Sequence, residues 1–422
     1  MLRKTVVLLF SLASIAGAQE LYVDINAQPG GNGSHNAPFN SIETAVAYAN
    51  GLPGIPNIRV APGHYPVSAT LLVQKTMIIQ GSNRMNIDAQ GFPTGADPLT
   101  ESRIVGTAAL GANTLVEIGN NGNLIPLLQI LNLSFEAGPG GGDIMNLTSA
   151  QGFVIRDCVF VGSSALPAPT NSNGIRTYAS SGEISGSYMT GVGAGAIARG
   201  GSPASPAIVA FHDNRSVGNK NGGVLLAGTS DGVLASGNEL YATVWNNDLS
   251  SSVATPVSFG IRIFVKGDED PVNAQLTSGH ITAVIWNNQL VGNSVGASID
   301  SGFTYRLVPP IANMVCDNRT FTGTLDLTFL NNTVAGSTNL PGVISFTRQQ
   351  TTLGQPNSPQ SSWQYLHNAV YSVIDPQHLF AGAKVDNPVD DPFVGGPCAA
   401  DVVHEALNNS LTINGVRQSH TP

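Results

Sequence analysis

The segment Thr243-Val244-Trp245-Asn246-Asn247 decides the fold, because it returns later in the chain as Val284-Ile285-Trp286-Asn287-Asn288. Each copy has apolar residues followed by a turn pair that ends in Asn. Related copies are Ala210-Phe211-His212-Asp213-Asn214 and Phe329-Leu330-Asn331-Asn332, and weaker ones end at Leu133, Cys158 and Ser187. Short apolar segments that repeat in this way predict a solenoid, in which every repeat is one coil of a parallel β-helix.

The spacing of the repeats grows along the chain. From Leu133 to Asn332 the successive intervals are 25, 29, 27, 33, 41 and 44 residues. A bare coil takes roughly 20 residues or slightly more and tolerates insertions at its loops. The growing intervals therefore predict longer loops toward the C-terminus.

Strand alternation orients the side chains of the repeat. If Phe211 and its equivalents face the core, then His212, Trp245 and Trp286 face outward, one above the other in successive coils. The Asn that ends each turn pair is expected to point inward. A column of Asn side chains can bond the backbone of neighbouring coils and tolerates the dihedral angles of a tight corner.

A second family of strands follows each Asn turn and begins with Gly. Examples are Gly174-Ile175-Arg176-Thr177-Tyr178 and Gly260-Ile261-Arg262-Ile263-Phe264. With Ile175 and Ile261 facing inward, Arg176 and Arg262 point outward, and Arg199 is a third candidate for this group.

The composition agrees with an all-β chain. Charged residues make up 11% of it, against roughly 25% in an ordinary soluble domain. The 48 Gly and 26 Pro residues leave little helix-forming material and provide many turns. The formal charge of −9 argues against a protein that binds nucleic acid through a basic face.

The first 18 residues are predicted to be an export signal. Arg3 and Lys4 precede an apolar run, and Ala16-Gly17-Ala18 supplies small residues for cleavage. The mature protein, with a formal charge of −11 once Arg3 and Lys4 are removed, is expected to be secreted, either extracellular or periplasmic. No other stretch approaches the roughly 20 apolar residues of a membrane helix, so no membrane span is expected.

Three cysteines after an export signal cannot form a disulfide framework. Cys158 lies in an apolar repeat and is expected to be a buried small hydrophobe. Whether Cys316 and Cys398 pair stays open, as does the oligomeric state.

The start of the mature chain resembles the N-terminal signature of the pectate-lyase-like right-handed parallel β-helix family. The matching residues are Tyr22-Val23-Asp24, Gly31, Gly33, Pro38-Phe39, Ser41-Ile42, Ala45-Val46 and Ile58-Arg59-Val60-Ala61-Pro62-Gly63-His64-Tyr65. The resemblance implies an all-β, right-handed, single-stranded parallel β-helix with a short N-terminal capping helix. Ser41 can cap that helix, which is expected to run to about Asn50 and to end at Gly51.

The resulting division of the chain has four parts. Residues 1–18 are the signal peptide, 19–66 the N-terminal cap and first coil, 67–372 the parallel β-helix, and 373–422 a C-terminal cap or tail. A short helix from about Ala400 to Asn408 is expected to cap the far end. Loop acids in the tail make Asp386, Asp390 and Asp391 weak candidates for a calcium site, although Asp-Pro turns need no metal.

The resemblance implies a broad set of functions, because the family includes polysaccharide lyases, glycoside hydrolases, epimerases, phage tailspikes and noncatalytic surface proteins. The first hypothesis is a protein that engages an extracellular or cell-wall polysaccharide along a lateral groove, and whether it also cuts that polymer is left open. Its candidate contacts are Trp245, Trp286, Arg156 and Tyr178, since indole faces suit the apolar faces of sugar rings. The competing interpretation is that long loops cover the tryptophans and make them a satellite core.

Two alternatives remain open. One is a lyase or hydrolase that acts on a uronate-containing polymer, with Arg176, Arg262, Asp300 and His212 as weak catalytic candidates. β-Elimination needs a cation, here calcium if any, and a base, while hydrolysis needs two carboxyl groups about 5 to 10 Å apart. The polygalacturonase-like combination of Asn-X-Asp followed by Gly-Asp-Asp is absent. The other alternative is a structural or adhesive surface protein, which needs neither set of residues.

Overall fold

The computed structural model describes residues 19–119, 124–168, 170–228, 238–250, 258–269, 276–277, 279–303, 323–337, 343–348, 361–366, 369–372, 380–386, 402–407, 410–413 and 416–419. The predicted signal peptide and both Cys316 and Cys398 lie outside these residues. Within them, no helix has the length and apolar character needed to cross a bilayer. The division of the chain into signal, cap, coils and tail stays a prediction.

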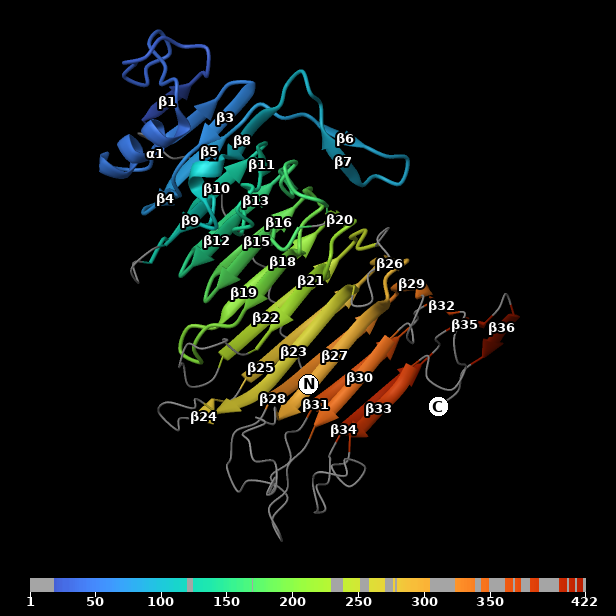
Figure 1. Cartoon of the computed structure of the whole chain (residues 1–422). Helices are drawn as coiled ribbons and strands as arrows, with labels where there is room; N and C mark the ends of the chain where they lie inside the picture. Colours follow the sequence, from blue (N-terminus) through green and yellow to red (C-terminus); the bar gives the residue numbers. More distant parts are fainter. Residues whose placement is uncertain are drawn as a thin grey trace.

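The chain is a right-handed parallel β-helix, as predicted. Its strands form three long walls, and neighbouring strands of a wall come from successive coils (Figure 1). The walls are called sheets A, B and C below.

Sheet A has 12 strands, all parallel to their neighbours. In spatial order they are β1 (Glu20–Val23), β2 (Asn57–Val60), β5 (Met77–Gln80), β10 (Leu128–Leu131), β13 (Gln151–Arg156), β16 (Ser181–Ser185), β19 (Ala207–His212), β22 (Asn238–Trp245), β25 (Gly279–Trp286), β28 (Gly323–Leu330), β31 (Ser361–Leu366) and β34 (Val402–Leu407).

Sheet B has 11 strands. They are β4 (Leu71–Val73), β9 (Val116–Ile118), β12 (Met145–Thr148), β15 (Ile175–Tyr178), β18 (Ala194–Arg199), β21 (Gly222–Ala227), β23 (Phe259–Glu269), β27 (Val295–Phe303), β30 (Val343–Arg348) and β33 (Phe380–Asp386), with β24 (Leu276–Thr277) antiparallel to β23.

Sheet C has a six-stranded and a five-stranded part. The first contains β3 (Gly63–Val67), β8 (Ser102–Gly106), β11 (Ser134–Glu136), β14 (Val159–Val161), β17 (Tyr188–Thr190) and β20 (Arg215–Val217). The second contains β26 (Gln289–Val291), β29 (Thr333–Ser337), β32 (Ala369–Ser372), β35 (Ser410–Ile413) and β36 (Val416–Ser419), the last antiparallel to β35. Asp248 bridges β20 and β26 and so joins the two parts.

The N-terminal end of the solenoid is closed by helix α1 (Ile42–Gly51), as predicted. Ser41 caps it, because the Ser41 hydroxyl accepts a hydrogen bond from the Thr44 amide at 3.3 Å. The helix buries Ile42, Ala45, Val46 and Ala49 against the first coils. This apolar face covers core side chains that an open coil would expose to water.

The helix predicted at about Ala400 to Asn408 is wrong. That segment forms strand β34, which pairs in parallel with β31. Its first residues, Val402 and Val403, are β-branched and favour a strand, and pairing with β31 satisfies backbone groups that an isolated short helix would leave open. Strands β33, β34 and β35 therefore continue all three walls beyond Ser372.

The core follows the predicted alternation. Phe211, Val244 and Ile285 are at most 2% exposed, while the residues that follow them point outward. Cys158 is fully buried and unpaired, as expected of a small hydrophobe, and burial raises the pKa of its thiol to about 12.

The two residues of each turn pair have different roles. The first residue of each pair is left-handed, with φ from 52° to 58° at Asn132, Asp157, Gly186, Asp213, Asn246, Asn287 and Asn331. The second residue points inward. The prediction assigned the unusual dihedral angles to the inward column, whereas the structure places them at the preceding residue.

The inward Asn residues form a continuous ladder, as predicted. The amide oxygen of each accepts the backbone N–H of the equivalent residue one coil earlier, at 2.9 to 3.1 Å from Ser187 to Asn332. Each side-chain N–H group also donates to a carbonyl of the preceding coil, such as Asn247 to Phe211 at 3.0 Å. The ladder therefore satisfies buried backbone groups at every corner.

A hairpin of β6 (Met85–Ile87) and β7 (Pro93–Ala96) stands out from the first coils beside sheet C (Figure 1). Asp88 in its turn forms an ion pair with Arg215 of β20 at 2.7 Å. Arg215 also contacts the largely buried Asp248 at 3.0 Å. The hairpin is thus tied to a coil 127 residues further along the chain.

Candidate functional site

Two outward faces carry the residues that the sequence singled out. The first lies on sheet A. His212, Trp245 and Trp286 occupy the same register on β19, β22 and β25. The imidazole of His212 stacks on Trp245 with ring centroids 4.0 Å apart, and Trp245 stacks on Trp286 at 4.8 Å with planes 2° apart. The predicted column of rings is confirmed.

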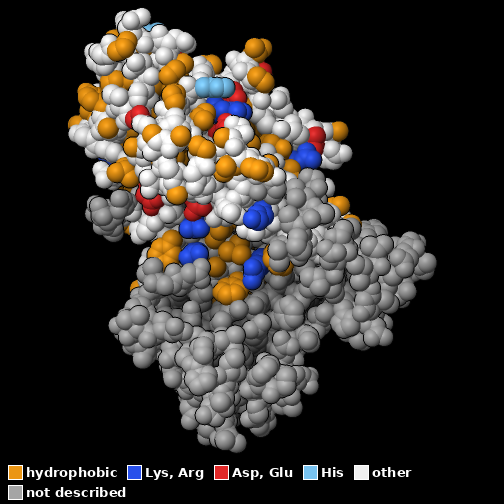
Figure 2. Space-filling model, in the orientation of Figure 1, with side chains coloured by type: hydrophobic (Ala, Val, Ile, Leu, Met, Phe, Trp, Pro, Cys, Tyr) orange, Lys and Arg blue, Asp and Glu red, His pale blue; other side chains and the backbone are white. Residues whose placement is uncertain are grey.

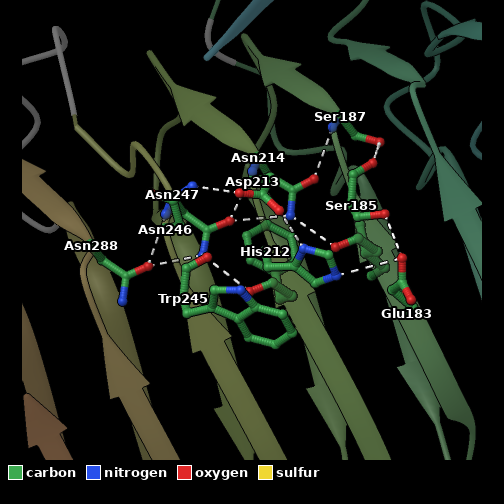
Figure 3. A network of polar contacts seen from close by, with 12 residues as sticks. Glu183, Ser185, Ser187, His212, Asp213, Asn214, Trp245, Asn246, Asn247 and Asn288 are labelled. Atoms are coloured by element: carbon green, nitrogen blue, oxygen red, sulfur yellow. Dashed lines mark hydrogen bonds and ion pairs between the residues drawn. The ribbon is translucent and has the colours of Figure 1, made fainter. Parts of the chain in front are cut away.

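Carboxylates hold both ring nitrogens of His212 (Figure 3). Nδ1 lies 2.6 Å from Asp213 Oδ2, and Nε2 lies 3.5 Å from Glu183 Oε1 on β16. The Ser185 hydroxyl donates to the same Glu183 oxygen at 2.7 Å, and the Asn246 side chain donates to Asp213. His212 therefore sits between two oriented acids, one of them from the preceding coil.

The electrostatics of the group favour a charged imidazole. Burial is the largest single influence and disfavours the charged ring, but the hydrogen bonds that the ring donates to Glu183 and Asp213 outweigh it and raise the pKa of His212 above its ordinary value. The hydrogen bond with His212 lowers the pKa of Glu183 to about 2. Glu183 is thus a carboxylate at neutral pH and not a proton donor.

This geometry limits what the column can do. Both faces of Trp245 are covered, one by His212 and the other by Trp286. A sugar ring stacks on an indole face, and Trp245 offers only its edge. Both nitrogens of His212 are engaged, so it is poorly placed to move a proton. Arg156 lies two coils before His212 in the same register, separated from it by Ser185.

Sequence reasoning missed a second histidine on this face. His280 of β25 lies 3.4 Å from Asp326 of β28, and its ring meets that of the exposed Tyr241 at 6.4 Å, edge to face. The hydrogen bond that the imidazole donates to Asp326 raises the pKa of His280. The sequence pattern does place His280 on the outward face of a strand. Its contact with Asp326 could not be predicted, because Asp326 lies on the strand of the next coil.

The second outward face lies on sheet B. Arg176 of β15 and Arg262 of β23 share one register, with Ile197 and Leu225 of the two intervening strands between them. Three steps at a strand spacing of about 4.8 Å separate the two arginines by roughly 14 Å. Figure 2 shows Lys and Arg side chains among hydrophobic ones on this side of the molecule. We call Arg176, Ile197, Leu225 and Arg262 the arginine row.

The two arginines differ in their partners. Arg176 forms an ion pair with Asp143 at 3.1 Å. The Arg262 guanidinium lies 5.1 Å from the ring of Phe259 and 5.6 Å from that of Phe264. In both arginines Nε is buried and makes no hydrogen bond within the described part of the chain. Both side chains are partly exposed, so an anionic ligand group in solvent could reach the accessible part of either guanidinium.

A parallel outward register lies beside the arginine row. Tyr178, Arg199, Ala227 and Phe264 follow one another on β15, β18, β21 and β23. Tyr178 and Phe264 are partly exposed and flank the row with aromatic surface. The four candidate sugar contacts therefore divide between two walls, with Tyr178 on sheet B and Arg156, Trp245 and Trp286 on sheet A.

Two acids at the N-terminal end of the row were also missed. Glu117 of β9 and Asn146 of β12 share the register of Arg176, and Asp143 precedes β12. Burial raises the pKa of Glu117, and the nearby Asp143 charge adds to the effect. The backbone N–H and the side chain of Asn173 donate to Asp143 at 3.0 and 2.8 Å.

A calcium site is not supported at this end of the row. Across the described ranges, no three His, Cys, Asp or Glu side chains lie close enough together to hold a metal ion. Asp143 is already committed to Arg176 and Asn173, which leaves too few free oxygen ligands for Ca²⁺. The side chains of Asp300 and Asp386, and all of Asp390 and Asp391, lie outside the described residues.

No protein-family model matches the chain, and no curated protein does. Three similar solved structures are ORF18 of Geobacillus virus E2, DFA-IIIase from Arthrobacter chlorophenolicus A6 in complex with GF2, and the family 28 exopolygalacturonase of Yersinia enterocolitica. Their identities are 10%, 15% and 12%, with TM-scores of 0.43, 0.40 and 0.42. The matches cover 94%, 93% and 94% of this chain, and 61%, 94% and 78% of theirs. The chain thus spans 61% of the length of ORF18, and these likenesses concern the fold alone.

Proposed function

We propose that this protein is secreted and binds an acidic extracellular polysaccharide along the arginine row. The observation that carries the proposal is Arg262, whose partly exposed guanidinium lies 5.1 Å from the ring centroid of Phe259 and 5.6 Å from that of Phe264. A planar guanidinium matches a carboxylate in geometry and charge.

The floor of the row suits the rest of a sugar polymer. Ile197 and Leu225 lie between the two arginines in register. Ile197 is only 8% exposed, and the partly exposed Leu225 presents apolar surface to the faces of sugar rings. Tyr178 and Phe264 add aromatic surface at the side. An extended chain along the solenoid axis would meet a cation at each end of this strip and apolar contacts between them.

Binding without cleavage is the form of the proposal that the described residues favour. Arg176 is held by Asp143, and both nitrogens of His212 are bonded to carboxylates, so neither is a free base. A base for β-elimination has to reach a proton of the substrate within hydrogen-bond distance. Arg262 is therefore assigned to binding.

Affinity electrophoresis tests the proposal. Polygalacturonate and a neutral glucan are cast into native gels, with low and high salt. We expect polygalacturonate to retard the protein, salt to weaken the effect, and Arg262→Ala to weaken binding about tenfold. Arg84→Ala removes an exposed arginine outside the row and serves as the matched control.

Three outcomes would overturn the proposal. Equal retardation by the neutral glucan would show that charge is not recognised. Equal affinity of the Arg262→Ala and Arg84→Ala proteins would remove the arginine row from the site. The protein is also incubated with polygalacturonate, once with calcium and once with chelator. Unsaturated products would show that the protein is a lyase and not a binding protein without activity.

A further inference from the structure

The outward face of sheet A contains two histidines that each reach a carboxylate on a neighbouring coil. His212 of β19 contacts Glu183 of β16, one coil earlier, and His280 of β25 contacts Asp326 of β28, one coil later. The Trp245–Trp286 stack joins β22 and β25 between these two contacts. Side-chain contacts thus connect four pairs of neighbouring strands from β16 to β28.

We propose that His212 and His280 form a proton-operated latch, which ties these coils together when the imidazoles are charged and loosens when they are neutral. The geometry behind the proposal is the placement of His212 between Glu183 and Asp213, against the face of Trp245. A charged imidazole gains from both carboxylates and from the indole face, while a neutral one loses the charge-dependent part of all three contacts.

The charged groups around His212 are mostly acidic. Glu183 faces it from β16, Asp213 from the end of its own strand, and Trp245 covers it from β22. Arg156 lies two coils earlier in the same register, next to Asp157 at 3.8 Å. Arg156 is the one cation in this set apart from His212.

The surroundings of His280 are acidic as well. Glu239 is its register partner on β22, and Asp326 approaches from β28. The third titratable neighbour is Tyr241, which is neutral until about pH 10. When both imidazoles lose their positive charge, fewer positive charges on the outward face of sheet A balance the negative ones. The acids concerned are Glu183, Asp213, Glu239 and Asp326.

The direction of the pH effect follows from linkage. Both histidines have a pKa raised above the ordinary value of 6.5 in the folded protein. Their contribution to stability is therefore complete below about pH 6.5 and is lost as the pH rises through the folded-state values. The latch is closed in mildly acidic solution and opens toward alkaline pH.

The test combines urea unfolding with tryptophan emission between pH 5 and pH 9. We expect the urea midpoint of the full-length protein to fall as the pH rises through the histidine range. Emission should change over the same range, because Trp245 lies against His212. The His212→Gln/His280→Gln protein should show a smaller fall in midpoint, and His212→Gln should lose the emission change. His64→Gln, at an exposed histidine of sheet C, is the control and should behave as the unmodified protein.

A second variant keeps the test decisive if His212→Gln does not fold. Glu183→Gln removes one of the two acids and should move the midpoint of the emission change to lower pH. The proposal is overturned if midpoint and emission stay constant from pH 5 to pH 9. It is equally overturned if the double variant keeps the full pH dependence, or if Glu183→Gln leaves the emission midpoint in place.

Discussion

The imidazole of His212 lies flat on the indole of Trp245, with centroids 4.0 Å apart and planes 10° from parallel. This contact results from register, because the two residues are direct partners on adjacent parallel strands. Neighbouring strands lie about 4.8 Å apart, a distance at which planar side chains in the same register stack on each other. In an outward aromatic column of a parallel β-helix, the ring faces can therefore contact one another and leave less ring surface for a ligand.

A double-mutant cycle measures this contact. His212→Ala, Trp245→Ala and the double variant are unfolded in urea at pH 6 and again at pH 9. We expect a coupling free energy of about 1 kcal/mol at pH 6, with a smaller value at pH 9. His212 paired with Trp286 gives the control cycle, since Trp245 separates these two rings. Equal coupling in the two cycles would contradict a direct stack.

The Asn ladder predicts a strong effect of Asn247→Ala. Asn247 is fully buried, accepts the Asn214 amide and donates to the Phe211 carbonyl and the Asn288 side chain. Its removal leaves buried polar groups without partners, which should lower the free energy of unfolding by about 2 to 4 kcal/mol. Urea unfolding measures the loss, and Asn86→Ala, at an exposed Asn, is the control. A loss no larger than in the control would show that water replaces the ladder.

The left-handed corner at Asn287 predicts opposite results for two substitutions. Its φ is 57° and its side chain is exposed. Asn287→Gly should change the free energy of unfolding by less than about 0.5 kcal/mol, because Gly adopts this conformation readily. Asn287→Val should cost about 1 to 2 kcal/mol, since a β-branched residue is strained there. Thermal unfolding compares them, and similar values for both would contradict the assigned backbone conformation.

The hairpin tether predicts local loosening on Arg215→Ala. Arg215 joins Asp88 of the hairpin to the largely buried Asp248. Without it, Asp248 loses its cation and the hairpin loses its anchor, at a cost of roughly 2 kcal/mol in global stability. Limited proteolysis followed by mass spectrometry should find faster cleavage within residues 82–101. The same cleavage rate in the Arg84→Ala protein and the Arg215→Ala protein would argue against a tether.

The repeat made the walls predictable. The Asn turn pairs specified where each coil bends, and alternation then placed Phe211 inside and His212 outside. Both inferences rest on local periodicity, which a single sequence contains. The exception was the far end, where the helix predicted near Ala400 is strand β34. That segment is a strand because it pairs with β31, and the local sequence pattern does not indicate which strand a segment will pair with.

The composition of the two faces was less predictable. Glu183 contacts His212 from the preceding coil, and Asp143 contacts Arg176 from a loop before the neighbouring strand. Such contacts depend on the register between coils and on side-chain direction, whereas the acids themselves follow no repeat. The arginine row was foreseen as two outward residues, but the apolar floor of Ile197 and Leu225 appears only when the coils are stacked.

The ladder separates two quantities that are linked in most folds, the length of the chain and the height of the molecule. Its rungs join residues 27, 33, 41 and 44 positions apart through the same contact at nearly the same distance. Each added coil raises the stack by one strand spacing, however many residues it contains. A foreign peptide placed in one of the long segments between rungs is therefore expected to be carried on the side of the stack as cargo, with the wall beneath it unchanged. The corners and the paired strands set the geometry, and only the loops between them are expected to accept such a change.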